Sequence, residues 1–244
     1  MLFLLFALVW AQPQRGSLKK YLSRIQTQSH TPLLVVISPG WNEEDLDPLL
    51  SSLWSEGFNL WTLHFPYETQ TSASVSADSR NAITSFSQAP IVVSHDFAGS
   101  LIVQDIAPVG TIMALALFSS PLNHRCAPAL EQALQETDED ELWEMLGDPA
   151  LRESNPLWRD YIVSLCRNPP RPSIENISMP IWAATSNINN VAPPESIRPF
   201  LHPNHTFFRP GPLNLNRIEP NSNEILSHPP TTKILLQWLR RVAR

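Results

Sequence analysis

Residues 89–99 constrain the fold more than any other part of the sequence. They begin with a β-branched run, residues 91–93, of the kind that forms buried strands. Small and polar residues follow at once, and residues 99–106 are compatible with a helix. This order predicts a buried strand that turns sharply into a helix, with Asp96 at the apex of the turn.

Strand-like and helix-like segments alternate through the first half of the chain. Apolar runs typical of buried parallel strands lie at residues 33–37, 58–64, 91–95 and 111–118. Leucines at helical spacing follow the first run, and a weaker helical pattern precedes the third, in which Ile83 and Phe86 could face inward. The alternation predicts an α/β fold with a doubly wound, mostly parallel sheet.

Further elements complete this core. Apolar residues at helical spacing within residues 18–25 suggest a short helix, although a strand is also possible there. Strands are expected again at residues 180–185 and 205–209, and a final helix is expected from residue 229.

The alternation stops after Pro121. Residues 123–176 read as helices and loops, which predicts a helical lid inserted between two parts of one core, residues 12–122 and 177–244. Residues 126–151 are rich in Asp and Glu and contain no Lys or Arg. Because they lack a motif with ligand spacing, their acidity is interpreted as a solvated face and not as a cation site.

The first eleven residues are expected to direct export. Residues 1–11 are apolar, too short to span a bilayer, and end in a small residue suited to signal-peptide cleavage, although no basic residue precedes them. An apolar first strand is the alternative reading. In an exported protein, Cys126 and Cys166 would be free to form a disulfide.

Composition limits the partners. The net charge of −6 and the pI near 5.6 argue against nucleic acid or an anionic membrane surface as the main partner. No later run is long enough to span a membrane, and neither a phosphate-binding glycine loop nor a zinc-ligand cluster is found in the sequence, so no cofactor or metal is expected.

Several short motifs, taken in their order along the chain, resemble those of a known fold. They are Pro39-Gly40-Trp41 after the first core strand, the elbow at residues 94–99, residues 117–121 after the next strand, Val191-Ala192-Pro193-Pro194-Glu195, and Ser227-His228-Pro229 before the last helix. From about residue 32 to the C-terminus this arrangement resembles the α/β-hydrolase fold. The resemblance implies an active site at the elbow, with Gly40 and Trp41 lining the oxyanion side of a pocket.

The same resemblance implies that the catalytic triad is degenerate. In that superfamily an elbow nucleophile is activated by a late histidine, which an acid orients. Here the elbow residue is Asp96, the acid position falls on Asn189, and the histidine position falls on Ser222. Neither Asn189 nor Ser222 can take up a proton near neutral pH.

Asp96 could still act as a catalytic nucleophile without the usual triad partners. Haloalkane dehalogenases and epoxide hydrolases, which this elbow resembles, use an Asp that forms an alkyl-enzyme ester, and a base must then activate water. His64 and His124 are the candidate bases, because both follow strands at their carboxyl ends. The less well placed histidines are His202, His205 and His228. Dehalogenases tend to place Trp after the Asp, and this chain has Phe97 in that pocket position.

The sequence therefore predicts an exported α/β-hydrolase-like protein with a non-catalytic binding or structural role. Its partner would be a protein or a small apolar ligand. One alternative is a hydrolase in which Asp96 is the covalent nucleophile. Another is an esterase that uses Ser94 or Ser100, neither of which holds the apex of the elbow.

Overall fold

The structure is a computed structural model of the 244-residue chain. It describes residues 17–20, 31–41, 43–65, 71–122, 161, 164–165, 167–170, 177–185, 206–208 and 228–243. The predicted signal segment, most of the predicted lid and both cysteines lie outside these residues. No helix in the described part of the chain is long and apolar enough to cross a membrane.

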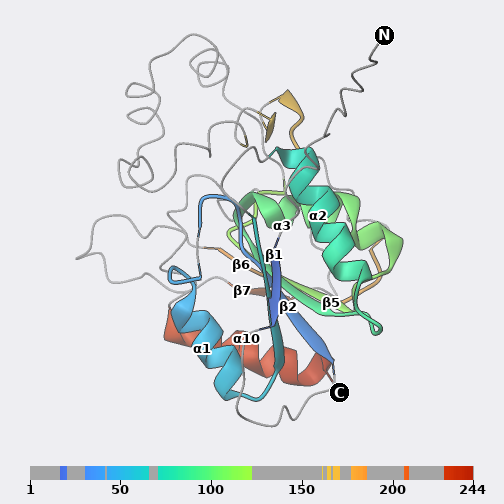
Figure 1. Cartoon of the computed structure of the whole chain (residues 1–244). Helices are drawn as coiled ribbons and strands as arrows, with labels where there is room; N and C mark the ends of the chain where they lie inside the picture. The colour runs from blue at the N-terminus through green and yellow to red at the C-terminus, as the bar shows by residue number, and fades with distance from the viewer. Residues whose placement is uncertain are drawn as a thin grey trace, which may run out of the picture.

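A seven-stranded sheet forms the centre of the described structure (Figure 1). Its strands are β1 (Ser17–Lys20), β2 (Pro32–Val36), β3 (Asn59–His64), β4 (Ile91–His95), β5 (Ala114–Phe118), β6 (Ile181–Ala184) and β7 (Thr206–Phe208). Their order across the sheet is β1-β3-β2-β4-β5-β6-β7, and every neighbouring pair is parallel except β1 with β3. The doubly wound, mostly parallel sheet is thus confirmed.

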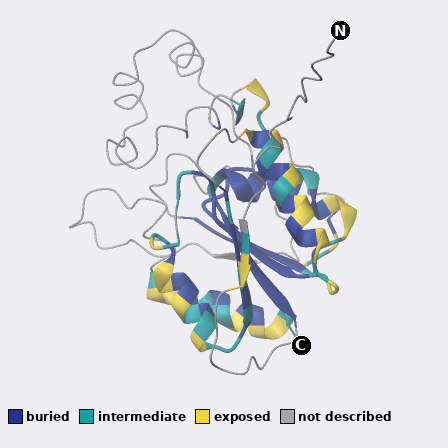
Figure 2. Cartoon of the chain, in the orientation of Figure 1, coloured by how far each residue is buried: buried dark blue, intermediate teal, exposed yellow. Residues whose placement is uncertain are grey.

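Helices cover both faces of this sheet (Figure 1). The first helix, α1 (Asp47–Ser55), and the last, α10 (Pro229–Val242), pack on one face, and α2 (Ser72–Thr84) and α3 (Asp96–Asp105) pack on the other. Because successive strand residues point to opposite faces, Leu33 and Val35 join one apolar cluster while Leu34 and Val36 join the other. The strands therefore form a buried layer between two helical layers (Figure 2).

The predicted helix near the N-terminus is wrong for residues 17–20, where the strand alternative holds. β1 pairs antiparallel with β3, from Ser17 opposite His64 to Lys20 opposite Trp61. Leu18 packs against the apolar cluster under α2 and α3, whereas Lys19 and Lys20 are exposed. Pairing with a neighbouring strand overrides local spacing in so short a segment.

The elements near the elbow agree with the predictions except at their ends. The weakly helical segment becomes α2, which begins with a capping box formed by Thr71 and Ser74. Ile83 is buried, and Phe86 is partly buried against the same cluster. α3 begins at Asp96 rather than at residue 99, so the carboxylate is the first residue of the helix.

Candidate functional site

The site is centred on the elbow between β4 and α3. Asp96 has φ of 54°, in the left-handed region that Asp tolerates better than most residues. Along residues 90–103 every residue except Asp96 is buried. The predicted sharp turn is confirmed, and it leaves the strained residue as the one partly exposed position of its segment.

Ser38 holds the two sides of the elbow together. It lies in the loop after β2, and its hydroxyl donates to the His95 carbonyl oxygen at 2.8 Å. The same hydroxyl accepts the Ala98 N–H at 3.2 Å. Ser38 is not among the site residues predicted from the sequence, although a serine directly after a buried strand is expected to lie at the carboxyl edge of the sheet.

His95 is a structural residue and not a base near neutral pH. Its side chain is buried, its Nε2 accepts the Ser38 N–H at 3.1 Å, and the Trp41 ring lies edge to face with it at a centroid distance of 5.3 Å. Its Nδ1 has no hydrogen-bond partner in the described part of the chain. Burial lowers the pKa of His95 to about 3, so the imidazole is neutral.

The Asp96 carboxyl group lies in a poorly hydrated environment with two neutral donors. Burial raises the pKa of Asp96 to about 7, and hydrogen bonds from the Phe97 backbone N–H and the Trp41 side chain offset part of that rise. Among the described residues no cation contributes to the pKa of Asp96. The group is therefore divided between its protonated and ionised forms near neutral pH.

Gly40 and Trp41 form the loop that faces the elbow. Gly40 has φ of 94°, and the Trp41 N–H donates to the Ser38 carbonyl oxygen at 3.1 Å, which closes a tight turn. This turn places the Trp41 indole against both His95 and Asp96. Phe97, the other predicted pocket residue, is 5% exposed and belongs to the cluster under α2 and α3, so its ring is mainly core.

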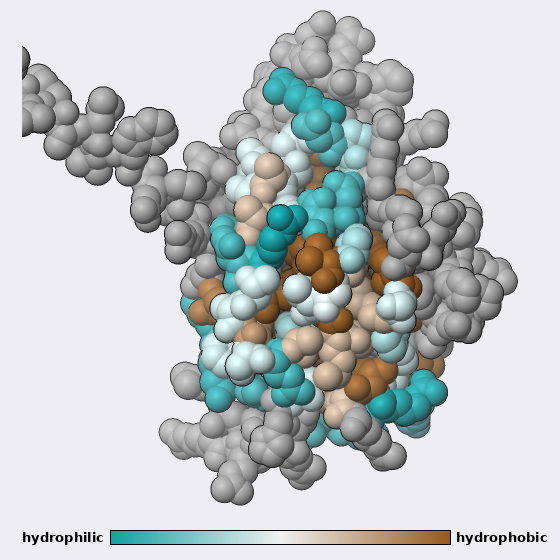
Figure 3. All heavy atoms as spheres, turned by 90° about the vertical axis from the view of Figure 1, so that its right-hand side faces the viewer, coloured by the Kyte–Doolittle hydropathy of each residue, from teal (hydrophilic) through white to brown (hydrophobic). Residues whose placement is uncertain are grey.

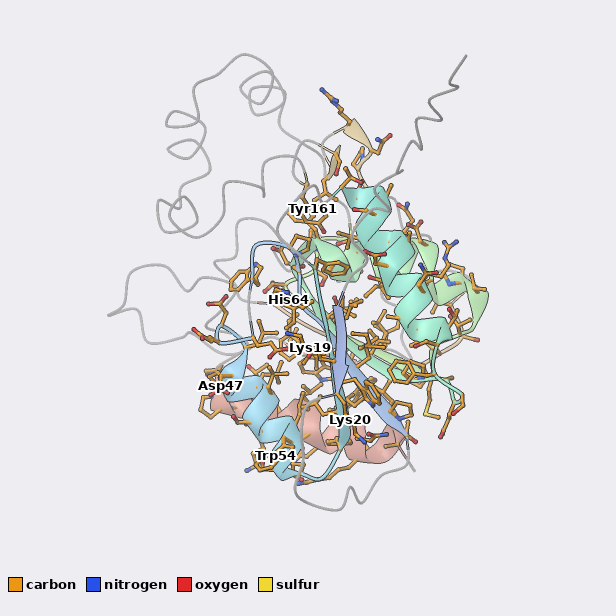
Figure 4. The ribbon with its side chains drawn as sticks, viewed as in Figure 1. Lys19, Lys20, Asp47, Trp54, His64 and Tyr161 are labelled. Atoms are coloured by element: carbon orange, nitrogen blue, oxygen red, sulfur yellow. The ribbon has the colours of Figure 1, made fainter. Side chains whose placement is uncertain are left out.

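Tyr161 is a further residue of the site and is not among those predicted from the sequence. It is buried, and its hydroxyl has no hydrogen-bond partner among the residues described. Its pKa is raised well above the ordinary value by burial and then by the charge of Asp96, which places the two side chains within electrostatic reach. Figure 4 shows Tyr161 beside the helices that cover this end of the sheet.

Ser164 fixes the segment that carries Tyr161. The Ser164 hydroxyl accepts the Ser72 N–H at the start of α2, at 2.7 Å, and donates to the Tyr161 carbonyl oxygen at 2.7 Å. Tyr161 and Leu165 both belong to the apolar cluster that contains Phe97. This attachment joins the segment of Tyr161 to the start of α2, a relation between distant segments that no local pattern encodes.

A second strained residue lies next to the elbow. His95 pairs with Phe118 in the β4–β5 register, so the residues that follow, Asp96 and Ser119, leave neighbouring strands. Ser119 has φ of 47°, and its buried hydroxyl has no hydrogen-bond partner within the described ranges. The loop after β5 therefore adds a small polar group at the same edge of the sheet.

His64 lies at the end of β3 (Figure 4). Its pKa is lowered by burial and by Lys19, whereas Glu43 and a hydrogen bond to the Trp41 backbone act in the opposite direction. These contacts join His64 to the loop of Trp41. Its role as a base stays a prediction.

The remaining candidates are placed as follows. The Ser94 hydroxyl donates to the Val36 carbonyl oxygen at 3.5 Å, and the Ser100 hydroxyl donates to the Pro121 carbonyl oxygen at 2.6 Å, so both serines are buried against the backbone. His228 lies before α10, with Nδ1 at 2.8 Å from the Thr231 hydroxyl.

The predicted residues outside the described part of the chain are His124, Asn189, His202, His205, Ser222, Cys126 and Cys166. Within the described ranges, no group of three or more His, Cys, Asp or Glu residues could hold a metal ion.

The chain is similar to known proteins in structure but not detectably in sequence. No protein-family model matches the chain, and no curated protein is detectably similar to it in sequence. An esterase from Thermogutta terrifontis superimposes with a TM-score of 0.68 at 13% identity, over 94% of this chain and 94% of the esterase. The enol-lactonase from Burkholderia xenovorans LB400 gives 0.69 at 12% identity, over 92% of this chain and 96% of the lactonase.

A third solved structure that superimposes on this chain is described as that of an alpha/beta hydrolase. MGS-MChE2, an alpha/beta hydrolase enzyme from the metagenome of lagoon sediments at Mar Chica, Morocco, gives a TM-score of 0.62 at 12% identity, over 94% of this chain and 97% of the enzyme. Each of these superpositions covers more than nine-tenths of both chains. The protein therefore has the α/β-hydrolase fold.

Proposed function

We propose that this protein is an exported, non-catalytic binding protein built on the α/β-hydrolase fold, with its ligand site at the elbow and residues 123–176 as a lid. The observation that carries the proposal is the environment of Asp96. The Phe97 N–H, the amide directly after the elbow residue, lowers the pKa of this carboxyl group as a hydrogen-bond donor, which indicates that the carboxyl group lies beside that amide. In hydrolases of this fold that amide stabilises the negative oxygen of the transition state.

An occupied oxyanion donor argues against acyl transfer. A substrate oxygen that gains negative charge would have to displace the Asp96 carboxyl group from the Phe97 amide. When Asp96 is ionised, the two negative groups would also repel each other. The elbow therefore opposes the charge that an ester or lactone substrate develops.

The lack of an engaged base supports the same proposal. In the described part of the chain, no imidazole contributes to the pKa of Asp96. The neighbouring His95 is neutral, with its Nε2 committed to the Ser38 N–H. Among the described residues, no group is therefore placed to activate the water that must release an ester formed on Asp96.

Catalysis by Asp96 is the competing function, and one observation favours it. The residue lies at the apex of a strained elbow and is partly exposed, which is where a covalent nucleophile must lie. The structures superimposed on this chain include an esterase and an enol-lactonase.

A substrate panel separates the two functions. Haloalkanes, epoxides and short-chain esters are incubated with the full chain, with Asp96→Asn and with Ser100→Ala, and product is measured by gas chromatography. We expect no turnover above the uncatalysed rate with any of the three proteins. Turnover that Asp96→Asn abolishes would establish the nucleophile, and turnover lost only in Ser100→Ala would establish the esterase.

The character of the described surface favours a small ligand over a protein partner. Among the described residues, Val109 is the one large hydrophobic side chain that is largely exposed. On the face shown in Figure 3, apolar groups form a small central area among polar side chains. Broad apolar patches mark protein-docking surfaces, whereas a partly exposed carboxyl group in an apolar setting marks a ligand site.

Export is tested by the N-terminus of the protein recovered outside the cytoplasm. Because Ala11 is a small residue directly after the apolar run, cleavage is expected to leave Gln12 as the first residue. N-terminal sequencing of the protein from a periplasmic or culture fraction measures this. Recovery of the chain only from the cytoplasmic fraction, with Met1 intact, would contradict export.

A further inference from the structure

We propose that the elbow site binds a small organic cation, namely an ammonium group that carries an apolar substituent. This inference rests on the proposed function, because a nucleophilic Asp96 would have to remain free to attack carbon. The site combines a carboxyl group, an aromatic ring and a hydroxyl group on segments that lie far apart in the sequence.

The first argument is the missing counter-charge. Asp96 is held among buried residues and receives only two neutral donors, the Phe97 amide and the Trp41 side chain. A carboxylate in such a place is usually paired with a cation, and the described part of the chain supplies none. An ammonium ligand would provide that charge, whereas an anionic ligand would be repelled.

The second argument is the Tyr161 hydroxyl. It is more than nine-tenths buried, has no partner among the described residues, and lies within reach of the Asp96 charge. A buried hydroxyl without a partner is costly, and such groups in native structures call for an explanation. A hydroxyl oxygen can accept an N–H, so an ammonium group beside Asp96 would satisfy both residues.

The third argument is the setting of these groups. Trp41 is partly exposed, and its ring lies edge to face with His95 beside the elbow, so an aromatic side chain borders the site. Tyr161 lies in an apolar cluster with the buried side chains of Phe97 and Leu165, so the surroundings of the site are poorly hydrated and favour an alkyl or benzyl substituent over a hydrated ion.

A metal ion fits the site less well. Calcium and magnesium require six or more oxygen ligands. Asp96 is a single carboxylate, and the described residues hold no cluster of metal-ligand type. One carboxylate with one hydroxyl and one aromatic ring suits a monovalent organic cation.

Titration calorimetry of the full chain tests the proposal with three probes of matched shape: butylammonium, butanol and butyrate, at pH 8. We expect butylammonium alone to bind. Asp96→Asn is expected to weaken its affinity about tenfold or more, because a charge pair is removed. Tyr161→Phe is expected to weaken it about threefold, because one hydrogen bond is lost. The matched control is Asp47→Asn, an exposed carboxylate on α1 that should leave affinity unchanged.

The pH dependence is a second readout. The titratable groups around the carboxyl group are Asp96 itself, His95 and Tyr161, with His64 reached through the Trp41 backbone. Affinity for butylammonium is expected to rise from pH 5 to pH 8 as Asp96 ionises and to stay flat in Asp96→Asn. Thermal unfolding of each variant checks that it is folded.

The outcomes separate this inference from the proposed function. Equal binding of butanol or butyrate, or no loss of affinity in folded Asp96→Asn, overturns the cation site. Absence of butylammonium binding together with absence of turnover overturns this inference and leaves the non-catalytic function standing. Turnover that depends on Asp96 overturns both.

Discussion

Gly99→Ala is expected to lower the free energy of unfolding by about 2 kcal/mol or more, although alanine is the better helix former by about 1 kcal/mol. A Cβ atom at this position would lie 2.1 Å from the Ser120 hydroxyl oxygen and 2.9 Å from Leu117 Cδ2. Both neighbours belong to β5 or the loop directly after it, and Leu117 is fully buried. α3 would have to move away from the sheet, which would displace the elbow with it.

Urea denaturation measures this effect, and Gly110→Ala is the matched control. Gly110 has φ of 72° and no atom within 4 Å of an added Cβ, so the cost there is backbone strain alone, about 1 kcal/mol. Ser120→Ala combined with Gly99→Ala is expected to destabilise less than the sum of the two single changes, because the clashing oxygen is gone. Equal stability of Gly99→Ala and the unaltered chain would contradict the close packing of α3 on this loop.

The elbow was predictable because its signal is local. A β-branched run, followed at once by small residues and a helix-compatible segment, specifies a strand-to-helix turn without knowledge of any partner. The same reasoning was wrong at residues 17–20, where β1 is an edge strand of four residues. Its conformation depends on pairing with β3, more than 40 residues away along the chain, and helical spacing of its apolar residues carries no information about that pairing.

The surroundings of Asp96 could not be predicted in the same way. Ser38 and Trp41 meet the elbow across more than 50 residues of sequence, and Tyr161 meets it across more than 60. No periodicity links these positions, because contacts between segments follow from topology. Motif order placed Gly40 and Trp41 near the elbow, whereas Tyr161 stands in a region that was read only as helices and loops.

Asp96→Asn is expected to raise the free energy of unfolding at pH 8 and to have little effect near pH 4. The pKa of Asp96 is about 7 in the folded chain against an ordinary value of 3.8, so the folded state holds the proton more tightly than the unfolded state. Ionisation of Asp96 therefore destabilises the fold progressively as pH rises from 4 through 7. The expected loss in free energy of unfolding is on the order of 3 kcal/mol, a value that already allows for the partial exposure of Asp96.

The difference between the two proteins isolates this effect from that of His95. His95 acts in the opposite sense, because a pKa lowered to about 3 from 6.5 makes the fold lose stability as pH falls below 6.5. That contribution is present in both proteins and cancels when their free energies are subtracted.

Asparagine keeps an oxygen that can accept the Phe97 and Trp41 donors, and it tolerates positive φ as aspartate does. Urea titrations of both proteins from pH 4 to pH 8 should give a difference that grows with pH and levels off above 7. A difference that does not vary with pH would mean that the carboxyl group is hydrated, and the case for a missing counter-charge at the elbow would then fail.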